Sequence, residues 1–202
     1  MEQRMFEFEL RADEETERGT RISGRPIVFN APTDMRDWIE VIDSGALDNT
    51  DLRDVRFLVN HNTDMIPLAR SRNNNANSTM FLEVVPEGMD ISVWLDTEKN
   101  ADASALYSAI ERGDISGMSF MFQADGDRWE DLDSEKPTRH ITSIARVFEV
   151  SAVTFPAYAQ TSITARGLAE SLESGKASLE SARAAKREDE RRRHKIKMLM
   201  EV

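Results

Sequence analysis

The feature that most constrains the fold is a succession of short runs of β-branched and aromatic residues separated by turn-forming residues. These runs are typical of strands and lie at residues 5–11, 21–29, 38–42, 55–59, 80–85, 89–95, 117–124 and 140–154. Between Thr97 and Arg112 the pattern is that of one helix, which Thr97 or Asn100 could cap and Gly113 could close. Because helices do not alternate with strands, we expect a β-rich α+β fold: a mostly antiparallel sheet or barrel core with an inserted helix.

Charge divides the 202-residue chain into two parts. Residues 1–165 carry 16 basic and 30 acidic side chains, whereas residues 166–202 carry 10 and 7. The second part has no proline or aromatic residue and is rich in helix-forming residues, so we expect a helix with a weak point at Gly175. The pattern predicts one domain at residues 1–165 and a charged helical tail at residues 166–202. The tail either docks on another surface or is a solvated, partly disordered end.

Composition excludes several classes of function. The chain has no cysteine, which rules out disulfides, thiolate metal sites and a cysteine nucleophile. A net charge of -11 disfavours binding to nucleic acid through its phosphates. No apolar run approaches the roughly 18 residues that a membrane span needs, and the acidic start does not resemble a secretory signal. We therefore expect a soluble protein that stays inside the cell, without a membrane or nucleic-acid partner.

Three histidines are the candidates for a catalytic base. His194 lies among cations in the tail, and we interpret it as a solvated residue. His140 begins a strand after a polar loop, where a surface role is favoured. His61 directly follows the apolar run 55–59, at a strand end where a rigid sheet meets a loop, and such edges often carry functional groups. His61 is therefore the strongest candidate of the three.

The candidate nucleophile is a serine in the segment GDISGMSFMF, residues 113–122. The two-residue period of a strand places Ser119 on one face with Gly117 and Met121, opposite a bulkier apolar face. Ser116, three residues earlier, is a rival nucleophile. The alternative is a structural role, in which Ser119 tolerates burial by bonding to backbone groups.

The candidate acid is Glu149, which lies amid apolar residues in a strand where an unpaired carboxylate is costly. The same counting places Glu149 on one face with Val147 and Ser151. Glu149 could orient the imidazole of a base and stabilise its charged form. The alternative is a salt bridge to Arg146 or to an arginine of another strand.

Two polar segments have simpler interpretations. Residues 71–78 have strong turn chemistry and should connect two strands at the surface. Asp125–Asp133 has acids at alternating positions, but Trp129 stands where a calcium loop needs an oxygen ligand. We interpret the acidic segment as a solvated surface loop and expect no metal site.

Four segments together resemble the prohead proteases of tailed bacteriophages, which are capsid-maturation serine proteases related in fold to the herpesvirus assemblins. They are ISGRPIVFN (22–30), DVRFLVNHNTDMIPLAR (54–70), RGDISGMSFMF (112–122) and FEVSAVTFPAYAQTS (148–162), and the resemblance covers about residues 20–165. The family's proposed active-site histidine of the NH motif, serine of the GxS motif and glutamate of the EVS motif fall on His61, Ser119 and Glu149. Asn62 and Met121 depart from the family pattern, which leaves the substrate groove and the oxyanion site undefined.

The resemblance implies a serine endopeptidase that removes the scaffolding segment of the major capsid protein, or a separate scaffold, and also cleaves itself. It implies action inside the procapsid, in the host cytoplasm, with the capsid precursor or scaffold as partner and no cofactor. A homo-oligomer, as in the assemblins, is left open. The tail resembles a scaffold-like packaging segment that is trimmed away. The alternative is a non-enzymatic capsid assembly or scaffold protein with a protease-like fold.

Overall fold

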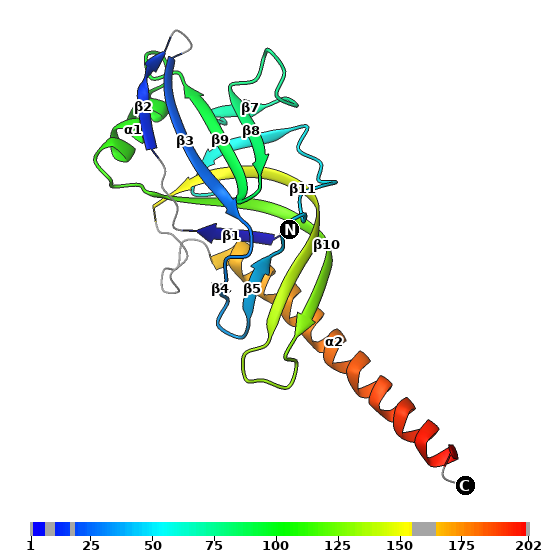
Figure 1. Ribbon diagram of the computed structural model, residues 1–202. Helices are drawn as coiled ribbons and strands as arrows, with labels where there is room; N and C mark the ends of the chain where they lie inside the picture. The colour runs from blue at the N-terminus through cyan, green and yellow to red at the C-terminus, as the bar shows by residue number, and fades with distance from the viewer. Residues whose placement is uncertain (1, 7–10, 17–18, 155–164, 201–202) are drawn as a thin grey trace.

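The computed structural model describes residues 2–6, 11–16, 19–154 and 165–200 (Figure 1). The helices are α1 (Ala101–Glu111) and α2 (Ala165–Met200). The described strands are β1 (Glu2–Phe6), β2 (Arg11–Thr16), β3 (Gly19–Val28), β4 (Thr33–Asp34), β5 (Ile39–Ile42), β6 (Val55–Val59), β7 (Ala69–Ser71), β8 (Met80–Val85), β9 (Gly88–Leu95), β10 (Gly117–Glu130) and β11 (Thr138–Val153).

The described strands form two sheets, which confirms the expected β-rich α+β class. One sheet has the order β1-β10-β11-β5-β4, with β6 also pairing with β11 and β7 pairing with β6; the other has the order β2-β3-β9-β8. Pairing is antiparallel except along β11, where β5 and β6 run parallel to its two halves. In the part of the chain described, these sheets are open and do not close into a barrel. The long strand β11 thus joins segments far apart in sequence (Figure 1).

One apolar cluster joins the two sheets and the helix α1. Phe120 and Phe122 of β10 stack at 4.9 Å between ring centroids, and both are fully buried. Ile22 and Val93 of the second sheet belong to the same cluster. Each such side chain contributes roughly 1.5–3 kcal/mol of burial free energy. The strand β10 is therefore anchored on this face by its aromatic residues.

Helix α1 has the predicted boundaries to within a few residues, and the structure selects Asn100 as its cap. The Asn100 side-chain oxygen accepts hydrogen bonds from the backbone N–H groups of Asp102 and Ala103 at 3.0 and 3.3 Å. Gly113 follows the helix with φ of 77°, a left-handed conformation that favours glycine. The helix therefore ends sharply at Glu111, and five residues separate it from β10, the strand that contains Ser119.

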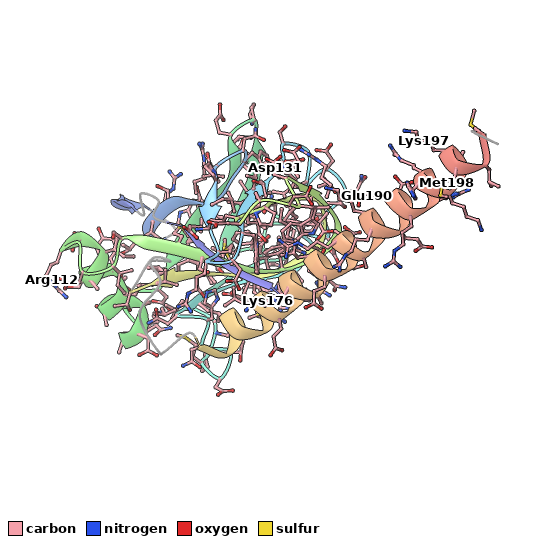
Figure 2. The ribbon with its side chains drawn as sticks, turned by 90° about the horizontal axis from the view of Figure 1, so that it is seen from below. Arg112, Asp131, Lys176, Glu190, Lys197 and Met198 are labelled. Atoms are coloured by element: carbon pink, nitrogen blue, oxygen red, sulfur yellow. The ribbon has the colours of Figure 1, made fainter. Side chains whose placement is uncertain are left out.

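Helix α2 confirms the expected helical tail but is continuous through Gly175, where we expected a weak point. An added Cβ at Gly175 would lie 2.4 Å from a ring carbon of Trp38, so the missing side chain allows the helix to pack closely on the body. Trp129 donates a hydrogen bond to the Ser178 hydroxyl at 2.9 Å. In Figure 2, Lys176 lies beside the body and Met198 lies on the projecting end of the helix. Part of the tail thus docks, and side chains from residue 187 to 200 are exposed.

One prediction about a loop was wrong, and one about a strand falls partly outside the described residues. Of the expected strand at residues 5–11, Met5 and Phe6 lie in β1 and Arg11 begins β2, and residues 7–10 lie outside the described residues. The acidic segment 125–133 is not a solvated loop for most of its length, because β10 continues to Glu130 beside β11. Its Asp127 accepts a hydrogen bond at 2.7 Å from the buried Arg139. The segment predicted as a connection at residues 71–78 does, in contrast, join β7 to β8, although Ser71 itself is the last residue of β7.

Candidate active site

The NH motif forms a sharp turn at the end of β6. Asn60 and His61 have φ of 52° and 55°, a left-handed conformation that non-glycine residues adopt rarely and asparagine tolerates best. The Asn60 backbone N–H donates to the carbonyl of Ala152 at 2.9 Å. The Asn60 side chain donates to the Thr154 hydroxyl and accepts from the Thr154 N–H, both at 3.0 Å. Asn60 therefore ties the end of β6 to the end of β11 and aims the next residue back over the sheet.

The turn brings the imidazole of His61 onto the carboxylate of Glu149, 88 residues away in the sequence. The distance between His61 Nδ1 and Glu149 Oε1 is 2.5 Å, and the two side chains are only 4% and 3% exposed. An ionised carboxylate accepts hydrogen bonds and cannot donate them, so in the neutral ring the proton belongs on Nδ1 and Nε2 keeps its lone pair. Within the described part of the chain, the buried Nε2 has no hydrogen-bond partner. The arrangement leaves Nε2 as a proton acceptor without a bound proton, which is the capacity that a general base needs.

The second oxygen of Glu149 is held by a hydroxyl of the same strand. Ser151 Oγ donates to Glu149 Oε2 at 2.5 Å and accepts from the backbone N–H of His61 at 3.1 Å. The alternative partner, Arg146, lies instead 4.0 Å from Asp51. An imidazole and a hydroxyl therefore compensate for the burial of the carboxylate.

Ser119 lies on the neighbouring strand, directly opposite Ser151. The antiparallel register of β10 and β11 pairs Ser119 with Ser151 and Met121 with Glu149. Residues directly opposite each other in such a pair share one face, with Cα atoms about 4.5–5.5 Å apart. Ser119 is fully buried, and on its other side β1 pairs Met5 with it. The rival Ser116 is exposed and precedes β10.

The two-residue alternation of side chains between the faces of β11 is interrupted at one position near the site. Phe122 pairs with Val147 and Phe120 pairs with Val150, so β11 contains one extra residue between these pairs. This bulge turns Val147 toward the apolar core and away from the face of Glu149, contrary to our prediction. The prediction that Glu149 and Ser151 share a face is confirmed, because both lie beyond the bulge.

The other two histidines lie elsewhere. His140 is at the opposite end of β11, where its Nδ1 is 2.7 Å from a carboxylate oxygen of Asp43 and its Nε2 is 3.4 Å from one of Glu130. His194 is exposed on the projecting part of α2. His61 is thus the histidine that the fold places beside Glu149 and one strand away from Ser119.

Sequence analysis singled out His61, Ser119 and Glu149 but assigned no role to Asn60 or Ser151. Their roles depend on hydrogen bonds between residues about 90 positions apart, which leave no local pattern. The asparagine before the histidine is a signal that could have suggested the left-handed turn. Among the described residues, no group of three or more His, Asp or Glu side chains could hold a metal ion. No described helix is long and apolar enough to cross a membrane.

The chain matches the family of caudovirus prohead serine proteases over residues 6–176, most of its length. It belongs to this family. The match includes the turn at His61, the strand of Ser119 and the strand of Glu149, and it ends within α2, just past Gly175. Comparison with curated proteins and with solved structures found no match. Membership gives this prohead protease a general role in capsid maturation, association with capsid proteins and a place inside the procapsid.

Proposed function

We propose that this prohead protease is a serine endopeptidase in which Ser119 is the nucleophile, His61 the general base and Glu149 the acid that orients the imidazole. The observation that carries the proposal is the 2.5 Å contact of His61 Nδ1 with Glu149, which leaves Nε2 without a partner among the described residues. Ser119 lies on the strand beside Glu149, opposite the serine that binds this carboxylate. These are the three roles that hydroxyl-based peptide hydrolysis needs.

In the proposed mechanism, Ser119 Oγ attacks the carbonyl carbon of the substrate peptide while His61 Nε2 accepts the hydroxyl proton. Glu149 stabilises the imidazolium that forms. When the tetrahedral intermediate collapses, the C–N bond breaks and His61 returns the proton to the leaving amine. Water then attacks the acyl carbon while His61 accepts a proton from it. The bond between Ser119 Oγ and the acyl carbon breaks, His61 returns the proton to Ser119 Oγ, and the carboxylic acid product leaves. Side chains of this chain supply the nucleophile and carry the proton transfers, and water is the second reactant.

The proposed substrate is the scaffolding segment of the major capsid protein precursor, or a separate scaffold, cleaved inside the procapsid in the host cytoplasm. The protease also cleaves itself. Residues 1–165 form the protease domain, and residues 166–202 form a charged, scaffold-like tail that is trimmed away. This division is supported by the start of α2 at Ala165 and by the exposure of its last turns.

One observation favours a second candidate function. Ser119 is fully buried and the His61 side chain is 4% exposed, so a substrate carbonyl reaches them only after the surrounding structure moves. A chain that stays closed would serve assembly as a non-enzymatic scaffold component. Activity of the wild-type chain under assembly conditions separates the two functions.

The test is cleavage of the purified capsid precursor, with new termini identified by mass spectrometry. Wild-type protein should cut the precursor, and Ser119→Ala should lower the rate by roughly a thousandfold or more because the attacking atom is gone. Ser116→Ala is the matched control and should retain activity. Normal cleavage by Ser119→Ala, with loss in Ser116→Ala, would move the nucleophile to Ser116. An inert wild type would favour the scaffold function.

A further inference from the structure

We propose that Ser151 is a positioning residue of this protease, whose hydroxyl couples the backbone of His61 to the carboxylate of Glu149. The inference rests on the proposed function and extends it to a residue that does not touch the reacting atoms.

The hydrogen bonds of Ser151 define its role. A serine hydroxyl has one proton to donate and lone pairs with which to accept. Ser151 directs its proton to Glu149 Oε2 at 2.5 Å and accepts from the His61 N–H at 3.1 Å. Because the Ser151 hydroxyl donates its proton to the Glu149 carboxylate, that proton is not available to a base, and we do not assign Ser151 as the nucleophile. Ser151 is fully buried, so bulk water does not replace it when it is removed.

Glu149 depends on this hydroxyl for its orientation. The carboxylate is 3% exposed, and one of its oxygens binds the imidazole of His61. The Ser151 hydroxyl binds the other oxygen, so the carboxylate plane is fixed at both ends. Without Ser151, the second oxygen would be buried and unpaired, and the side chain would be free to turn away from the ring. The strength of the His61–Glu149 contact should then decrease.

His61 depends on the same hydroxyl for its backbone position. The residue has φ of 55°, a strained conformation that persists only where surrounding contacts hold it. The bond from its N–H to Ser151 is such a contact, and it acts on the backbone that carries the imidazole. The Ser151 hydroxyl therefore fixes both the backbone of the proposed base, His61, and the side chain of the proposed acid, Glu149. Its register partner on β10 is Ser119, so all three proposed catalytic residues are placed relative to Ser151.

The test compares Ser151→Ala and Ser151→Thr with a matched control, Ser71→Ala. Ser71 is also a fully buried serine, the last residue of β7, and its hydroxyl donates to Asn74 Oδ1 at 3.1 Å rather than to a group of the site. Ser151→Ala should lower kcat by about ten- to a hundredfold with KM within about twofold, as expected for loss of one bond to a charged group. Ser151→Thr, which keeps the hydroxyl, should recover most of kcat. Ser71→Ala should lower thermal stability without changing kcat.

A second readout does not depend on activity. The proton shared by His61 Nδ1 and Glu149 should give a far-downfield proton NMR signal in the Ser119→Ala background. Adding Ser151→Ala should remove or shift that signal, and adding Ser71→Ala should leave it in place. If a variant is inactive because it is misfolded, the dispersed signals of the folded protein disappear from its proton NMR spectrum. In that case the comparison of Ser151→Thr with the wild type tests the inference.

The outcomes separate this inference from the proposed function. Unchanged kcat and an unchanged signal in Ser151→Ala would overturn the positioning role, whatever Ser119→Ala shows. Full activity of Ser119→Ala would overturn the proposed nucleophile, while the NMR comparison still tests the coupling. A fluorophosphonate that labels Ser151 rather than Ser119 would also overturn the inference, because Ser151 would then be the nucleophile.

Discussion

At the scale of single residues, the site is built on a buried carboxylate in a strand whose other face belongs to the apolar core. The Glu149 side chain is 3% exposed, and Val150, the next residue of β11, is part of that core. A buried carboxylate destabilises the fold unless its oxygens are bonded, and here an imidazole and a hydroxyl bind one oxygen each. The structure thus ties the position of the Glu149 carboxylate to the orientation of the His61 imidazole.

Replacing Glu149 by glutamine tests this coupling. Glu149→Gln keeps the shape but removes the negative charge, and its amide group presents N–H donors where Ser151 or His61 also donates. Turnover should fall by about a hundredfold to ten-thousandfold, since the imidazolium loses its stabilising charge. The measurement is the rate of precursor cleavage, with circular dichroism to verify the fold. Glu83→Gln on the exposed side of β8 is the control; equal effects of the two variants would contradict the role of Glu149.

At the scale of elements, the strand that carries Ser119 has no free edge near this residue. β11 pairs with one side of β10, and β1 pairs with the other, with Arg4 opposite Phe120 and Met5 opposite Ser119. Residues 2–5 of β1 precede the family match, which begins at residue 6. An extended peptide that joined β10 at this edge would have to displace β1. The N-terminal strand therefore limits access to the proposed nucleophile.

Removing residues 1–6 should make Ser119 more reactive. Deletion of β1 uncovers the edge of β10, so the rate of labelling of Ser119 by a fluorophosphonate should rise several-fold over that of the full chain. Peptide mapping by mass spectrometry measures the labelled fraction over time.

A matched pair of point variants tests the same idea without shortening the chain. Arg4→Pro removes one backbone donor from β1 and should also raise the labelling rate, whereas Arg4→Ala keeps the backbone pairing and should not. Equal labelling of the full and shortened chains would show that β1 does not limit access. Size-exclusion chromatography identifies any association through the newly exposed edge.

At the scale of the whole molecule, surface ion pairs make stability depend on pH. The Arg70 guanidinium bonds Asp54 at 2.6 Å and holds the pKa of that carboxyl below its usual range. A hydrogen bond from Lys136 lowers the pKa of Asp34 in the same way. A carboxyl group whose pKa is lowered by folding stabilises the fold fully at pH values above its pKa in the unfolded chain, which is near 4. Its stabilising contribution is lost as the pH falls through the lower pKa of the folded state.

The free energy of unfolding should therefore decrease as the pH falls below about 4. Urea unfolding at pH 7, 4 and 3 measures it. Asp54→Asn should make the decrease smaller, because that carboxyl no longer titrates. Asp64→Asn is the control, since Asp64 is exposed and forms no ion pair within the described residues. An identical pH dependence in Asp54→Asn and the wild type would show that the pair with Arg70 contributes nothing measurable.

Local patterns in the sequence predicted most elements of this molecule. Runs of β-branched and aromatic residues located the strands β6 and β8 to the residue. The helical pattern and Gly113 located α1, while the choice between Thr97 and Asn100 as its cap stayed open. These signals work because a strand or a helix turn is determined by neighbours a few positions away. The prediction failed at Val147, because a bulge in β11 turns this side chain to the opposite face. It also failed at residues 125–130, where a polar segment belongs to β10 and its Asp127 is bonded to the buried Arg139.

The sequence by itself determined the family, the β-rich class, and three residues whose chemistry fits a hydrolase. Only the tertiary structure decided that β6 runs parallel to β11, that His61 turns back onto Glu149, that Ser151 bonds both, and that Gly175 packs on Trp38. The physical reason is separation along the chain. Contacts between residues tens of positions apart depend on how strands pair and where bulges shift them, and neither is encoded in a short window of sequence.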